Sequence, residues 1–250
     1  MEPAMSAIIG TLGKDLETLE RLCAVVRECQ GCVALDAAPR YGNLEVVGEV
    51  MRKSGIARES FLVTTKVNAS RQREMGARES LASDLAALGL DYVDHYLIHS
   101  SSYEGFARTW EEMVQLKEEG LVRSIGVSTF AAGELAALPG EPPAIVQVPP
   151  QSEYAGEEMM ARLHEAGVRV EGYSFVRKLV ETSSARPELE VLCKENGMDL
   201  GMAAVSWCWQ HGIVPILGTT RPERLASCLS VASTPLDEEL ETAIGEALFA

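Results

Sequence analysis

Apolar residues in this chain follow two kinds of spacing. Short runs rich in Val, Ile and Leu recur along its length, and the longer stretches between them place apolar residues three or four positions apart. The first spacing is typical of buried strands and the second of helices with one buried face. Eight runs are predicted as strands: residues 7–11, 32–37, 61–67, 93–99, 124–129, 145–149, 168–174 and 214–217.

A helix is predicted after each strand. Glycines such as Gly55, Gly89 and Gly120 stand just beyond several of these helices, where a left-handed residue commonly ends a helix. The helices are predicted at residues 15–29, 44–53, 73–88, 103–119, 131–138, 157–165, 200–210 and 222–229. Two additional helices are expected at 187–196 and 237–248, and the segment 175–186 is expected to be compact.

Alternation of strand and helix is typical of a parallel sheet. Eight such units in one chain favour closure into an α/β fold of the (β/α)₈ TIM barrel type over an open sheet. No segment rich in Pro, Gly or Ser divides the chain, so we expect a single domain over residues 1–250.

The charge and composition narrow the possible partners. The 250 residues carry a formal net charge of −15 without a long Lys/Arg run, which argues against nucleic acid. The sequence shows no export signal, no apolar segment of membrane-spanning length and no disulfide-type cysteine framework. No metal-binding motif stands at the strand ends. We expect a cytoplasmic monomer or weak homodimer that binds neither membrane, nucleic acid nor metal.

Four polar residues follow or end three neighbouring strands. Asp36 and Tyr41 come at the end of the second predicted strand, Lys66 ends the third, and His99 ends the fourth. In a TIM barrel, catalytic groups come from this C-terminal end of the strands, so these four side chains are expected to meet at one mouth.

Together the four residues suit proton donation. A tyrosine has a pKa of about 10, and a neighbouring ammonium group favours its phenolate, so Lys66 is expected to lower the pKa of Tyr41. Asp36 would keep Lys66 charged and oriented. His99 would then hydrogen-bond the oxygen of a substrate and direct it toward Tyr41.

With these residues the chain resembles the aldo-keto reductase family. The matching stretches, in the family's order from about Ile9 onward, are LDAAPRYGN at 35–43, TK at 65–66, DYVDHYLIH at 91–99, GVS at 126–128, GYS at 172–174 and PILGT at 215–219. The resemblance implies reduction of an aldehyde or ketone carbonyl, with Tyr41 as general acid, Lys66 and Asp36 tuning it, and His99 positioning the carbonyl.

The resemblance also implies NADPH as cofactor, with NADH possible. Ser128, Thr129 and Gln147 fall at positions that hold the nicotinamide carboxamide, and Tyr173 at the aromatic that stacks on the ring. The remaining implied cofactor contacts are Gly10 and Thr11 after the first strand, and Gly218, Thr219, Thr220, Arg221 and Arg224 around the adenosine 2′-phosphate. A guanidinium gives a phosphate a charged, bidentate contact.

Two departures from the family pattern affect the cofactor. Thr129 replaces the Asn of a Ser-Asn pair, and Ser227 and Cys228 replace a Glu-Asn pair near the adenosine. Weaker binding, or a changed preference for NADP over NAD, is expected. The short loops and short C-terminal end also predict an open substrate site.

Two other functions remain open from the sequence. One is a regulatory protein that binds NADP(H) on a reductase fold and turns over little. The other is a barrel aldolase that forms a Schiff base on Lys66, although a neighbouring carboxylate would raise the pKa of that lysine and oppose this chemistry.

Overall fold

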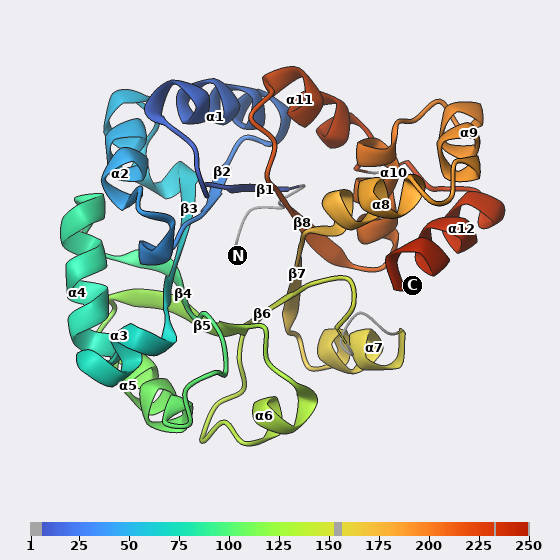
Figure 1. Cartoon of the computed structure of the whole chain (residues 1–250). Coiled ribbons are helices and arrows are strands. Elements are labelled where there is room, and N and C mark those ends of the chain that lie inside the picture. Colours follow the sequence, from blue (N-terminus) through green and yellow to red (C-terminus); the bar gives the residue numbers. More distant parts are fainter. Residues whose placement is uncertain (1–6, 153–156, 233, 250) are drawn as a thin grey trace.

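Eight parallel strands form a closed barrel in the computed structural model, which describes residues 7–152, 157–232 and 234–249 (Figure 1). The strands are β1 (Ile8–Gly10), β2 (Val33–Asp36), β3 (Phe61–Val67), β4 (Val93–Ile98), β5 (Val122–Ser128), β6 (Ile145–Val148), β7 (Arg169–Tyr173) and β8 (Ile213–Leu217). Each strand pairs with the next along the chain, and the barrel closes where Ile9 of β1 pairs with Leu217 of β8. The predicted TIM barrel is confirmed. The predicted single unit 1–250 also includes residues 1–6, 153–156, 233 and 250, which lie outside the described residues.

Helices surround the barrel (Figure 1). They are α1 (Leu16–Gln30), α2 (Leu44–Lys53), α3 (Ala69–Glu74), α4 (Gly76–Leu88), α5 (Phe106–Glu118), α6 (Ala132–Ala136), α7 (Glu157–Glu165), α8 (Phe175–Ser183), α9 (Glu188–Glu195), α10 (Leu200–Gln210), α11 (Pro222–Ser230) and α12 (Glu238–Phe249). Two short 3₁₀ turns, η1 (Pro39–Tyr41) and η2 (Arg58–Ser60), follow β2 and precede β3. Among the described residues, none of these helices has the length and apolar character that crossing a membrane requires.

One helix prediction was wrong, and one helix was not predicted. The helix expected at 73–88 is two helices, because Asn68 starts α3 by accepting a hydrogen bond from the Arg71 backbone, and the chain then breaks at Gly76, where φ is +76°. The segment 175–186 contains α8, which buries Phe175 and Leu179. Its start carries no side-chain cap, since Ser174 takes a left-handed conformation, and so the usual signal for a helix N-terminus is missing.

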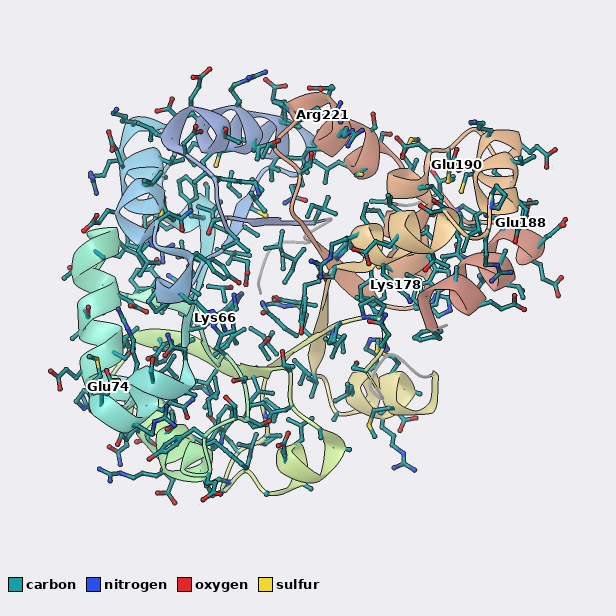
Figure 2. All side chains as sticks on the ribbon, viewed as in Figure 1. Lys66, Glu74, Lys178, Glu188, Glu190 and Arg221 are labelled. Atoms are coloured by element: carbon teal, nitrogen blue, oxygen red, sulfur yellow. The ribbon has the colours of Figure 1, made fainter. Side chains whose placement is uncertain are left out.

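The inside of the barrel is divided into an apolar part and a polar part. Ile8, Cys32, Ala34 and Leu62 form a small apolar cluster from β1 to β3 and the residue before β2. Side chains alternate across a strand, so Asp36 on β2 and Lys66 on β3 share the inward face with Ala34 and Leu62 and lie nearer the C-terminal mouth. Figure 2 shows Lys66 inside the ring of helices, whereas Glu74 and Glu188 lie at its outer edge.

Gly48 sets how closely α2 packs on α4. A Cβ atom at Gly48 would overlap the carbonyl oxygen of Leu88 and lie 2.7 Å from its carbonyl carbon. We predict that Gly48→Ala lowers the free energy of unfolding by about 1–3 kcal/mol, since the colliding atoms are backbone and cannot turn away. Urea unfolding followed by circular dichroism measures this.

Gly133→Ala is the matched control. Gly133 lies in α6, and an added Cβ meets nothing within 4 Å. This variant should be as stable as the parent or slightly more so, because alanine is the better helix former. Equal stability of Gly48→Ala and Gly133→Ala would contradict the packing argument.

Candidate active site

The four residues predicted to act together meet at the C-terminal mouth of the barrel. Asp36 is the last residue of β2, Tyr41 ends the η1 turn that follows it, and Lys66 lies on β3. His99 comes directly after β4, and its ring stands edge-on to that of Tyr41 with 5.9 Å between the centroids. The geometry therefore brings together side chains from three adjacent strand ends.

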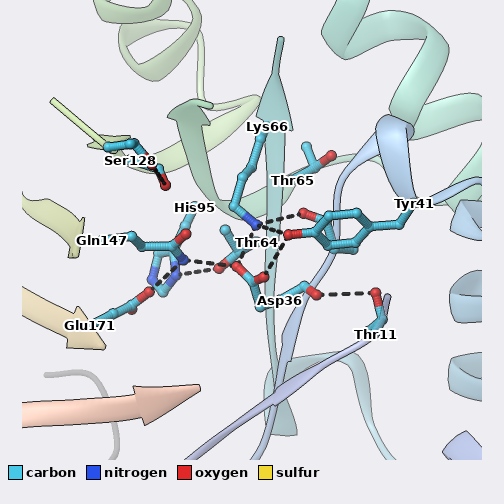
Figure 3. A network of polar contacts seen from close by, with 12 residues as sticks. Thr11, Asp36, Tyr41, Thr64, Thr65, Lys66, His95, Ser128, Gln147 and Glu171 are labelled. Atoms are coloured by element: carbon cyan, nitrogen blue, oxygen red, sulfur yellow. Dashed lines mark hydrogen bonds and ion pairs between the residues drawn. The ribbon is translucent and has the colours of Figure 1, made fainter. Parts of the chain in front are cut away.

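Lys66 is the centre of this cluster. Its Nζ donates to Asp36 Oδ1 at 2.6 Å, to Tyr41 Oη at 3.2 Å and to the backbone oxygen of Ala37 at 3.2 Å (Figure 3). The hydroxyl of Tyr41 in turn donates to Asp36 Oδ2 at 3.3 Å. All three ammonium hydrogens thus have acceptors, which a buried charge requires.

Burial and neighbouring charges together set the pKa values of Lys66 and Tyr41. Lys66 is 1 % exposed, and burial acts to lower its pKa, but Asp36 and Tyr41 together outweigh burial and raise the pKa above its ordinary value. Lys66 acts to lower the pKa of Tyr41, as expected, but the net shift of that pKa is upward. Burial raises the pKa of Tyr41, the Asp36 carboxylate raises it further, and the opposing effect of Lys66 is smaller than these two. Tyr41 is therefore a protonated phenol at neutral pH.

His99 is held in its neutral form. Burial lowers its pKa to about 4, and the positive charge of Lys66 acts in the same direction. Its Nδ1 is buried and has no hydrogen-bond partner among the described residues. A neutral imidazole carries one N–H donor and one acceptor nitrogen, so His99 can donate a hydrogen bond to a bound oxygen without taking up a proton.

A cavity of about 840 Å³ opens directly on Asp36, Tyr41 and His99. Most of the residues predicted to contact a cofactor line it: Gly10, Ser128, Thr129, Gln147, Tyr173, Gly218, Thr219 and Arg224. Three do not. Thr11 is buried and its hydroxyl donates to the Asp36 backbone oxygen, while Thr220 and Arg221 are exposed outside the lining. Figure 2 shows Arg221 at the start of α11.

Gln147 and Thr129 have partners within the protein. Gln147 Nε2 donates to Asp36 Oδ1 at 2.8 Å and to Glu171 Oε2 at 2.9 Å. Thr129, where the family carries Asn, has a left-handed backbone with φ of +58°, and its Oγ1 lies 2.8 Å from the hydroxyl of Tyr173. Thr129 therefore contacts the aromatic side chain in the cavity wall.

The sequence analysis missed two groups of residues at this site. The first is a wall formed by α8 and the helices that follow it, which contributes Val176, Arg177, Val180, Glu190, Cys193 and Lys194 to the cavity lining. The second is the ion pair on β7 between the buried Glu171 and the partly exposed Arg169. A charged residue between apolar neighbours on a buried strand was the available signal for Glu171.

Lys14 was missed as well. It is 4 % exposed, lines the cavity, and its Nζ donates to the backbone oxygen of Gly218 at 3.0 Å, which ties the loop after β1 to the loop after β8. Burial lowers its pKa. Within the described ranges, no group of three or more His, Cys, Asp or Glu side chains is placed to hold a metal ion.

Comparison with known proteins shows what this chain is related to. An aldo-keto reductase of Mycolicibacterium paratuberculosis is 35% identical over 237 residues, which cover 92% of this chain and 81% of that protein. The crystal structure of an aldo/keto reductase from Brucella melitensis superimposes with a TM-score of 0.79 at 28% identity, covering 97% of this chain and 94% of the other.

A Bombyx mori aldo-keto reductase, solved in complex with NADP, shares the fold with a TM-score of 0.79 at 24% identity, over 96% of this chain and 88% of the other. The model of the aldo/keto reductase family matches residues 14–248. The chain therefore belongs to the aldo/keto reductase family of oxidoreductases.

Proposed function

We propose that this protein reduces aldehyde or ketone carbonyls to alcohols with NADPH as reductant, and that Tyr41 is the general acid. The observation that carries the proposal is the position of the Tyr41 hydroxyl, 3.2 Å from Lys66 Nζ and 3.3 Å from Asp36 Oδ2, on the wall of a large cavity. The proposal includes one barrel domain over residues 1–250 that acts as a monomer or weak homodimer on small carbonyl substrates.

The cavity suits a nicotinamide cofactor. Ser128 and Gln147 offer polar groups on adjacent strands, where their Cα atoms are paired, and the Tyr173 ring lies on the next strand. Arg224 lines the same cavity from the first turn of α11, where its guanidinium would meet the 2′-phosphate. When bound, NADPH supplies a hydride to the carbonyl carbon.

Tyr41 would deliver the proton that the reduced oxygen needs. Its raised pKa keeps the proton on the phenol until a substrate oxygen accepts it. Lys66 donates a hydrogen bond to the phenol oxygen and would stabilise the phenolate that remains, while Asp36 holds Lys66 in place. The neutral imidazole of His99 would donate its N–H to the carbonyl oxygen and align it with Tyr41.

The same geometry opposes a Schiff-base aldolase. That chemistry needs a neutral amine, and the pKa of Lys66 is raised by the groups around it. If borohydride trapping with a carbonyl substrate added mass to Lys66, the reductase proposal would be wrong.

Tyr41→Phe tests the general acid. Loss of the phenol proton should reduce NADPH oxidation with 4-nitrobenzaldehyde about 100-fold or more, because positioned acids contribute about that much, while the Kd for NADPH stays nearly unchanged. Absorbance at the nicotinamide band and fluorescence titration measure the two quantities.

Tyr92→Phe is the control, since Tyr92 accepts a hydrogen bond from Arg123 and does not line the cavity. It should keep full activity. Tight binding of NADPH without any turnover that depends on Tyr41 would indicate the regulatory protein instead of a reductase.

The lowered pKa of His99 predicts a pH-dependent stability. Unfolded His99 gains a proton near pH 6.5, whereas folded His99 gains one only near pH 4, so the unfolded state binds more protons between these values. Stability is therefore lost as pH falls from about 6.5 toward 4. At pH 5 this loss should be on the order of 1–2 kcal/mol.

His99→Gln should lose less free energy of unfolding between pH 7 and pH 5 than the parent does. Urea unfolding at both pH values measures this. His164→Gln removes an exposed imidazole at the end of α7 and should leave the loss as it is in the parent. Equal losses in the parent and in His99→Gln would contradict the assignment of a neutral, buried imidazole.

Arg224→Ala tests the preference between cofactors. Only NADPH carries the 2′-phosphate, so loss of the guanidinium should weaken the binding of NADPH about 10-fold and leave the binding of NADH unchanged. Arg221→Ala is the matched control, because Arg221 does not line the cavity and should leave both Kd values unchanged. An unchanged ratio of the two Kd values in Arg224→Ala would show that the phosphate is bound elsewhere.

A further inference from the structure

Glu171 is a fully buried carboxylate inside the barrel that the proposed chemistry does not use. It is 0 % exposed and lies on β7, where its Cα pairs with that of Gln147 on β6. Gln147 pairs in turn with Ser128 on β5. Ser128, Gln147 and Glu171 thus form one row across three adjacent strands, and the first two of them line the cavity.

Both hydrogens of the Gln147 amide are used by carboxylates. Nε2 donates to Asp36 Oδ1 at 2.8 Å on one side and to Glu171 Oε2 at 2.9 Å on the other. An ionised carboxylate only accepts hydrogen bonds, so both contacts require the amide nitrogen and exclude the amide oxygen. Figure 3 shows the oxygen of Gln147 on the side of Ser128, away from the two carboxylates.

Glu171 is itself held in place. Its Oε1 accepts a hydrogen bond from Arg169 Nε at 3.1 Å, and Arg169 Nη2 lies 2.9 Å from His95 Nε2. His95 Nδ1 contacts the hydroxyl of Thr64 at 3.1 Å. The two buried carboxylates are therefore matched by two cations, Arg169 for Glu171 and Lys66 for Asp36, which offsets part of the cost of burying them.

We propose that Glu171 is a positioning residue that acts through Gln147. With Asp36 it fixes the amide so that its oxygen faces the cavity and accepts an N–H from the carboxamide of a bound nicotinamide. This inference rests on the proposed function. A residue that presents only an acceptor selects a ligand with a donor at that point.

Glu171→Gln tests this selection, because an amide at position 171 can donate as well as accept, so that Asp36 alone still requires the Gln147 nitrogen. Binding is measured by calorimetry with two ligands: NADP⁺, and its 3-acetylpyridine analogue, in which a methyl group replaces the carboxamide NH₂. One hydrogen bond separates the two ligands, so the parent should prefer NADP⁺ about 3- to 10-fold. The variant should prefer it less than about 2-fold.

Two further variants support the test. Glu119→Gln removes the same charge from the surface, where Glu119 pairs with Arg78, and should keep the preference of the parent. If Glu171→Gln does not fold, the double variant Arg169→Met, Glu171→Met removes both partners of the ion pair, a change that proteins generally tolerate better than a single unpaired buried charge. It should also lose the preference.

The outcomes separate the two proposals. If the parent binds neither ligand, the proposed function is wrong and this inference falls with it. If the parent prefers NADP⁺ and the folded Glu171 variants keep that preference, the role of Glu171 is overturned while the proposed function stands.

Discussion

The ion pair between Lys66 and Asp36 determines the arrangement of the rest of the site. Both side chains are buried inside the barrel, and neither would be stable there alone. Removing one partner of a buried ion pair destabilises a protein by roughly 3–5 kcal/mol, because the other charge is left unpaired. The Asp36 carboxylate has three donors, from Lys66, Tyr41 and Gln147. The position of the phenol and the position of the amide in the cavity wall therefore both follow from one carboxylate at the end of β2.

The barrel interior around this carboxylate has an apolar half and a polar half. On the side of β1 to β3, apolar residues such as Ala34 and Leu62 lie below the ion pair and close the interior. Toward β4, β6 and β7 the interior is polar, and Arg169 contacts both Glu171 and His95 there. A polar interior is stable only when its groups are paired, so this half restricts side-chain orientation more than the apolar half does. The same pairing uses both amide hydrogens of Gln147, so its side-chain oxygen is the group that it can offer to the cavity.

The sequence predicted the barrel and the cluster at its mouth because both follow from local patterns. Eight buried runs separated by helical spacing specify alternating strands and helices, and the end of a strand specifies the mouth, so Asp36, Lys66 and His99 could be placed together. The direction in which the pKa of Tyr41 shifts could not be obtained this way. It depends on whether burial and the Asp36 charge raise that pKa more than Lys66 lowers it. The helix α8 was not predicted because its first residues carry no capping signal. The contact between Glu171 and Gln147 was not predicted because it joins residues that are 24 apart in the sequence.

Thr129 shows how one substitution in the family pattern changes the cavity wall. A β-branched residue with a φ of +58° is strained, by about 1–2 kcal/mol, where an asparagine would fit more easily. The hydrogen bond between Thr129 Oγ1 and the hydroxyl of Tyr173 offsets part of this strain. Compared with asparagine, Thr129 places a shorter polar side chain beside Ser128. In return, its hydroxyl holds the hydroxyl end of the Tyr173 ring. If a cofactor ring stacks on Tyr173 as proposed, a ring held in this way would need less ordering, so the lost amide and the fixed ring would act on ligand affinity in opposite directions.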